Sequence, residues 1–139
     1  NSQTVLGKFG NGGTSSIISY ALRQGDGYIR ADFSNGTNAL SSDNYSLSLN
    51  NWVQMVYVWD RVNSTLYTYS NGVLKQTKTI TISGGIRNGN TNLYIGSYNG
   101  GEYSQYFKGQ IGIVKMYKKA LSTTEVQNNY NSNKALYGL

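Results

Sequence analysis

The sequence predicts an all-β fold, an antiparallel β-sandwich with one short helix. Runs rich in β-branched and aromatic residues alternate with short turns built from Gly, Asn and Asp. Gly and Asn tolerate positive φ, so the chain can reverse its direction at each of these turns. A single capped segment near the end has a helical pattern instead. No linker or repeat divides the 139 residues, so we expect one domain spanning residues 1–139.

The runs that predict strands are 15–22, 28–33, 52–59, 66–70, 75–82, 93–96 and 110–117. The run 52–59 is apolar on both faces, which is typical of a central strand, and we expect Trp52 and Trp59 in the core. Asn71-Gly72 lies between two of the runs. It predicts a two-residue hairpin, because a type I′ turn needs positive φ at both central positions.

Residues 123–131 are predicted to form the helix. Ser122 and Glu125 have the spacing of a capping box, in which each side chain binds the other residue's backbone N–H. Leu121 precedes the cap and Val126 follows at the fourth helical position, which is the arrangement of a hydrophobic staple.

The composition excludes several classes of function. The sequence contains no Cys and no His, so it holds neither a disulfide framework nor a Ser-His-Asp or Cys-His catalytic set. Its net charge of +6 comes from scattered Lys and Arg, with one short cluster at Lys115, Lys118 and Lys119. We therefore do not expect nucleic acid as the partner. No apolar run approaches the ~18 residues of a membrane span, so membrane insertion is not expected.

Five segments, taken in order, resemble the concanavalin A-like, laminin-G-like domains. They are WVQMVYVWD at 52–60, LYTYSNG at 66–72, LYIGS at 93–97, FKGQIGIVKMY at 107–117 and ALSTTEVQNNY at 120–130. The resemblance implies a concanavalin A-like antiparallel β-sandwich, or jelly roll, with one short helix in the C-terminal region. Two departures stand out: Gln54 replaces the usual His, and Gly112-Ile113 replaces an acidic pair.

Domains of this family begin with further strands before the first segment matched here. Since the sequence opens near TVLGKFG at 4–10, we expect the N-terminal strands to lie outside these residues. Three explanations are open: these strands are cleaved off, lie in another segment, or are supplied by a neighbouring chain. A sandwich without them has an open sheet edge, which favours strand addition from a partner.

We expect no catalytic residues. Some concanavalin A-like folds are glucanases with paired Glu residues, and retaining hydrolysis needs two carboxyl groups about 5–5.5 Å apart. Only Glu102 and Glu125 are present, no E-x-D-x-x-E motif occurs, and Glu125 is already assigned to the helix cap.

The segment 97–106 is the candidate ligand-binding site. Aromatic rings stack on the apolar faces of sugars, and amide groups exchange hydrogen bonds with their hydroxyls. The predicted ligand-binding residues are Tyr98, Asn99, Glu102, Tyr103, Gln105 and Tyr106. The alternative is an ordinary long connection whose Tyr side chains pack on the rim of the sandwich.

The resemblance also implies a calcium site, because laminin-G-like domains can bind calcium through rim carboxylates and carbonyls. Asp60 with Asn63 is the best candidate for such a metal site. The alternative is that Asp60 only closes the end of a strand. No other cofactor is expected.

Three functions remain open. The first is a non-enzymatic surface binding module, the glycan-binding or adhesion domain of a virion capsid decoration or tail protein, present in many copies at a virion surface or extracellularly. It is based on the resemblance to laminin-G-like domains carried on virions. The second is a purely structural virion assembly protein, whose sandwich neighbouring structural protein chains complete. The third is a binding module of a secreted bacterial protein.

Overall fold

The computed structural model describes residues 2–9, 18–100 and 103–139. Its contacts divide the chain into two compact units, each assembled from two separate stretches of sequence. Unit 1 comprises residues Asn1–Leu47 and Ile82–Val114, and unit 2 comprises Ser48–Thr81 and Lys115–Leu139. Each unit holds its own β-sheet. Whether the two behave as the one domain expected from the sequence stays a prediction.

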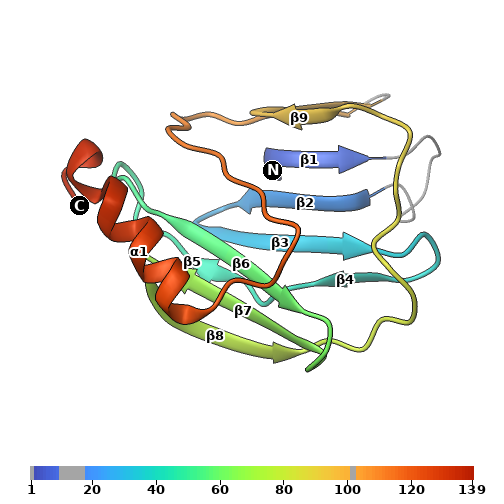
Figure 1. The fold of residues 1–139 in the computed structure, drawn as a ribbon. Coiled ribbons are helices and arrows are strands. Elements are labelled where there is room, and N and C mark those ends of the chain that lie inside the picture. Colours follow the sequence, from blue (N-terminus) through green and yellow to red (C-terminus); the bar gives the residue numbers. More distant parts are fainter. Residues whose placement is uncertain (1, 10–17, 101–102) are drawn as a thin grey trace. The chain divides into compact units, whose positions relative to one another are not determined.

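The sheet of unit 1 is built around β1. Its main strands are β1 (Gln3–Phe9), β2 (Ile18–Gly25), β3 (Tyr28–Ser34), β4 (Ala39–Ser41), β10 (Ser97–Gly100) and β11 (Tyr103–Tyr106), in the order β10-β11-β1-β2-β3-β4. Two further strands join it: β5 (Tyr45–Ser46) pairs with β3, and β9 (Leu93–Ile95) pairs with β1. Figure 1 shows β9, β1, β2 and β3 side by side. All pairings are antiparallel except that of β1 with β11.

The β2–β3 hairpin follows from local sequence. Gly25 pairs with Tyr28, which leaves Asp26 and Gly27 as a two-residue loop, and Gly27 adopts a φ of 77°. Along β3, Ile29 and Ala31 are buried on one face of the strand, and Asp32 is buried on the other. The start of the first predicted run, residues 15–17, lies outside the described residues.

The sheet of unit 2 is a three-stranded antiparallel ladder, β6 (Met55–Asp60), β7 (Thr65–Ser70) and β8 (Val73–Thr79), in that order (Figure 1). Asn71 and Gly72 join β7 to β8 with φ values of 50° and 75°. The type I′ hairpin predicted from Asn-Gly is therefore confirmed.

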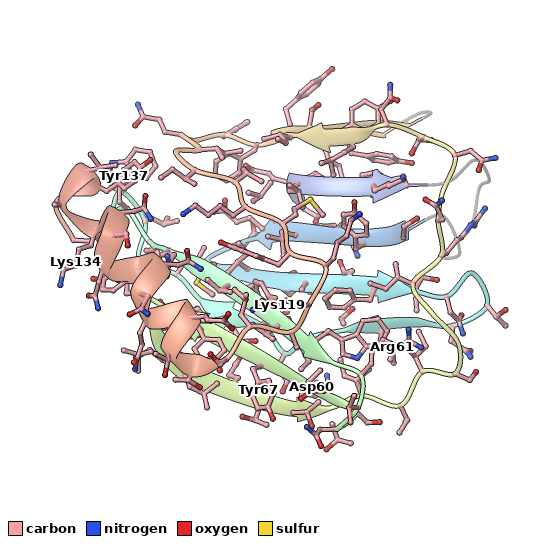
Figure 2. The ribbon with its side chains drawn as sticks, viewed as in Figure 1. Asp60, Arg61, Tyr67, Lys119, Lys134 and Tyr137 are labelled. Atoms are coloured by element: carbon pink, nitrogen blue, oxygen red, sulfur yellow. The ribbon has the colours of Figure 1, made fainter. Side chains whose placement is uncertain are left out.

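Helix α1 (Thr123–Asn133) begins at the predicted capping box and continues into the short 3-10 helix η2 (Lys134–Tyr137). The Glu125 N–H donates to Ser122 Oγ at 3.2 Å, and the Ser122 N–H donates to Glu125 Oε2 at 2.8 Å. Lys119, labelled in Figure 2 on the approach to the helix, forms an ion pair with Glu125. The hydrogen bond from Lys119 and then that from the Ser122 N–H to the carboxylate lower the pKa of Glu125 to about 2.

The helix packs on the β6–β7 face of unit 2. Val58 and Tyr69 of the sheet form one core with Leu121 and Val126, so both members of the predicted hydrophobic staple are buried. The hydroxyls of Tyr69 and Thr123 lie 3.1 Å apart, within hydrogen-bond distance. Tyr130, one turn beyond Val126, lies against the hairpin turn, where a Cβ at Gly72 would come 3.0 Å from its ring.

Residues 110–117, predicted as a strand, do not form one. Strand propensity becomes a strand only where another strand supplies hydrogen-bond partners. Among the described residues, no strand pairs with this segment. Ile111 is half-buried, and the other apolar side chains are exposed, namely Ile113, Val114, Met116 and Tyr117.

The run 52–59 also differs from its prediction. The strand begins only at Met55, because the backbone of Gln54 bonds to Asn71 instead: its N–H donates to Asn71 Oδ1 at 2.9 Å, and its carbonyl accepts from the Asn71 N–H at 3.0 Å. Within the described ladder, β7 is central and β6 lies at the edge. Trp52 and Trp59 are half-buried rather than core residues, and the Trp52 ring contacts Tyr137 at a centroid distance of 4.7 Å.

In the part of the chain that the structure describes, no helix combines the length and the apolar character that a membrane span requires.

We expect Gly72→Ala to destabilise the protein more than Gly27→Ala. Both glycines occupy the second loop position of a two-residue hairpin, with φ near 75°, so both variants carry the ~1–2 kcal/mol cost of left-handed backbone. Only Gly72 also faces the Tyr130 ring; a Cβ at Gly27 meets nothing within 4 Å. Urea denaturation of both variants measures the difference. Equal losses would show that Tyr130 does not pack on the turn.

The capping box predicts acid sensitivity. Because the folded pKa of Glu125 is lowered from 4.5 to about 2, its contribution to stability is complete above pH 4.5 and is lost as the pH falls toward 2. Thermal unfolding followed by circular dichroism should show wild type more stable than Glu125→Gln at pH 6. That gap should close progressively between pH 4.5 and 2. A constant gap across this range would contradict the assignment.

Candidate functional site

The predicted binding segment 97–106 forms the β10–β11 hairpin, so the expectation of a long connection is wrong. Ser97 pairs with Tyr106, and the ladder continues to Gly100 opposite Tyr103. Because the Asn-Gly-Gly turn signal lies in the middle of the segment, its two flanks can pair with each other. The hairpin places β10 at the edge of the unit 1 sheet.

Gly96 is the point at which the chain leaves β9 and enters the hairpin. Its φ is 76°, a conformation that suits Gly. Its N–H donates to the Val5 carbonyl at 2.8 Å, and its own carbonyl accepts from the Phe107 N–H at 2.9 Å. Beyond this residue the chain pairs with β11, and β11 returns to β1 at Tyr106, opposite Thr4. Both β9 and β11 therefore pair with the same edge of β1.

Tyr98 is held by an aromatic contact with β1. Its ring centroid lies 4.0 Å from that of Phe9, with the planes tilted by 36°. The buried Phe9 ring lies over Gly7, where a Cβ would come 2.4 Å from it. The missing side chain at Gly7 thus makes room for Phe9, and Phe9 supports Tyr98.

Gln105 lies directly opposite Tyr98, so the two side chains share one face of the hairpin. The hydroxyl of the fully buried Thr4 donates to Gln105 Oε1 at 3.3 Å. This bond directs the amide carbonyl toward β1. The amide NH₂ supplies two further N–H donors.

The structure separates the other predicted residues from this pair. Tyr106 follows Gln105 along β11, so it faces the opposite side of the sheet, and its side chain is 58% exposed. Asn99 lies in β10 opposite Ser104, and Tyr103 begins β11. Glu102 lies outside the described residues. The segment thus offers two faces, one with Tyr98 and Gln105 and the other with Tyr106.

Asp60, the candidate calcium ligand, ends β6 in unit 2 (Figure 2). Its Oδ1 accepts the backbone N–H groups of Val62 and Asn63 at 3.0 and 3.2 Å, and its Oδ2 accepts from Asn63 Nδ2 at 2.7 Å. The hydrogen bonds from Asn63, its side chain first, and from Val62 lower the pKa of Asp60. Asn63 therefore presents its amide nitrogen, not its oxygen, to the carboxylate.

Across residues 2–9, 18–100 and 103–139, no three His, Cys, Asp or Glu side chains gather in a group that could hold a metal. Calcium at Asp60 stays a prediction. The hydrogen bonds at this carboxylate are those of a turn that closes a strand.

A polar group that the sequence analysis missed lies on β2, β3 and β4. Asp32 is only 3% exposed, and its carboxylate forms an ion pair with Arg23 Nε, lies 3.2 Å from Arg30 Nε and accepts a hydrogen bond from the Ser41 hydroxyl. Arg23 is opposite Arg30 on the neighbouring strand. The sequence could have predicted this pair of arginines, because the Asp26-Gly27 turn determines the register between β2 and β3.

A family model described as the Concanavalin A-like lectin/glucanases superfamily, of laminin G type, matches residues 1–127. The chain therefore belongs to this superfamily, which confirms both the resemblance and the all-β concanavalin A-like class predicted from the sequence. No curated protein matches the chain significantly. One solved structure, an S-layer domain-containing protein from Clostridium thermocellum ATCC 27405, is similar at a TM-score of 0.46 and 18% identity. That match covers 94% of this chain, which spans 63% of the solved one.

Proposed function

We propose that the chain is a non-enzymatic binding module that recognises glycans at an exterior surface, as the adhesion domain of a virion capsid decoration or tail protein. The observation that carries this proposal is the edge hairpin β10–β11. It presents Tyr98 and Gln105 on one face and the 58% exposed Tyr106 on the other. Membership of a superfamily whose description includes lectins supports it.

The chemistry of these side chains suits sugars. An exposed Tyr ring can stack on the apolar face of a pyranose, and an amide can donate to and accept from its hydroxyls. One such site binds weakly. Many copies on one particle multiply the effective affinity without any new contact, which fits a multicopy surface role.

The lowered pKa of Glu125, the Glu side chain that the structure describes, supports a role without catalysis. A glycosidase acid needs a pKa raised toward neutrality so that it can donate its proton. Glu125 has a pKa of about 2, because Lys119 and the helix cap hold it as a carboxylate. Its part in the molecule is structural.

A second candidate is structural assembly, in which strands from neighbouring protein chains complete the fold. Residues 110–117 favour it, because a segment with strand character and exposed apolar side chains is a template for strand addition. The third possibility from the sequence, a binding module of a secreted bacterial protein, shares the glycan-binding chemistry of the first.

Retention on immobilised glycans tests the first proposal. Tyr106→Ala and Tyr103→Ala should abolish retention while the circular dichroism spectrum stays unchanged. Tyr117→Ala is the matched control, since it removes an exposed Tyr ring from unit 2 and should retain wild-type binding. Unchanged retention in both hairpin variants would overturn the site.

Intact mass and copy number in the native particle test the assembly role. A chain of 15.3 kDa in a fixed ratio to a capsid or tail protein is the expected result for assembly. A larger polypeptide containing these residues would contradict completion by neighbouring chains.

A further inference from the structure

The group around Asp32 carries more positive charge than Asp32 requires. We call Arg23, Arg30, Asp32 and Ser41 the Asp32 cluster. Two guanidinium groups share one carboxylate, so the cluster has an excess of one positive charge. A single Arg would neutralise Asp32, and the Ser41 hydroxyl already supplies a further hydrogen bond.

The second arginine has a cost. Arg23 and Arg30 are direct cross-strand partners, and like charges in that position destabilise a sheet. Burial of Asp32 explains one of them, because a buried carboxylate needs a charged partner. An anionic ligand that binds between the two guanidinium groups would explain the presence of the second arginine.

The geometry leaves donors for such a ligand. Both side chains make their closest contact with Asp32 through Nε, which lies at the inner end of the guanidinium group. The two Nη groups at the outer end carry four of the five N–H donors, in a planar fork that matches a carboxylate. The side chains of Arg23 and Arg30 are 22% and 31% exposed, so solvent reaches them.

The cluster lies beside the candidate site in unit 1. Arg23 is opposite Thr4, and the Thr4 hydroxyl donates to Gln105. Because cross-strand partners share one face of a sheet, the arginines lie on the same face as Thr4. By the same rule Tyr106, the partner of Thr4 on β11, lies on that face, and the fully buried Thr4 lies between Tyr106 and Arg23, so the cluster is one strand away from the Tyr106 side of the candidate site.

We propose that Arg23 and Arg30 form an anion-binding subsite, and that the preferred glycan carries a carboxylate, as uronic acids do. The inference rests on the proposed glycan-binding function and narrows its ligand class. Asp32 orients the two arginines, and their outer N–H groups bind the sugar carboxylate through charge-assisted hydrogen bonds.

A matched pair of ligands tests the subsite. Tetragalacturonate and its methyl ester share one backbone and differ in charge. In calorimetric titrations of the 139-residue chain, we expect the acid to bind at least tenfold more tightly than the ester. In side-chain NMR spectra, the acid should shift the Nε–H signals of Arg23 and Arg30. Raising the salt concentration should reduce the preference.

Variants separate the subsite from general charge. Arg30→Gln should remove the preference for the acid over the ester, while Arg30→Lys should retain only part of this preference, since Lys has no planar fork. Lys8→Gln removes one positive charge from the same unit, where Lys8 bonds to the exposed Asn88, and should keep the preference. A native amide NMR spectrum verifies the fold of each variant.

The outcomes distinguish the two proposals. Equal binding of acid and ester by wild type, with both abolished by Tyr106→Ala, would overturn the anion subsite and leave the glycan site standing. A preference for the acid that Lys8→Gln also removes would overturn it too. If neither ligand binds and the Arg signals do not shift, the subsite fails for its chosen ligand class, and retention on other glycans then decides the proposed function separately.

Discussion

The pairing of β1 along both of its edges holds the unit 1 sheet together. One edge pairs with β2, and the other is shared between β9 and β11. Sharing is possible because Gly96 turns the chain out of one ladder and into the next. The ends of β1 then position the candidate site: Phe9 supports the Tyr98 ring, and Thr4 orients Gln105. A change that disturbs β1 would therefore disturb the sheet and the site together.

Three carboxylates in the described part of the chain have structural tasks. Asp32 is buried between two arginines, Asp60 closes the turn after β6, and Glu125 completes the helix cap. The hydrogen bonds at Asp60 and Glu125 lower the pKa of each of these two carboxyl groups.

Sequence reasoning succeeded where structure depends on neighbouring residues. The Asn71-Gly72 turn and the Ser122–Glu125 capping box were both predicted, because each is decided within four positions of the chain. It failed where the partner is remote. Residues 110–117 have strand character but no described strand beside them, and Trp52 lies before β6 because Asn71 binds the intervening backbone.

The candidate site shows the same division. Composition identified Tyr98, Gln105 and Tyr106, but only the strand register shows that Tyr106 faces away from the other two. The Asp32 cluster was missed because Arg23 and Arg30 become neighbours only through the hairpin register. That register was within reach, since the Asp26-Gly27 turn determines it.

The exposed segment 110–117 has a consequence for how the protein behaves in solution. Many proteins blunt such segments with proline, and this sequence contains none. Lys115 and Lys118 are exposed within or beside this segment, and like charges there oppose the approach of a second copy. Salt screens this repulsion over about 8 Å at physiological ionic strength and over shorter distances in stronger salt. We therefore expect stronger salt to promote self-association through this segment.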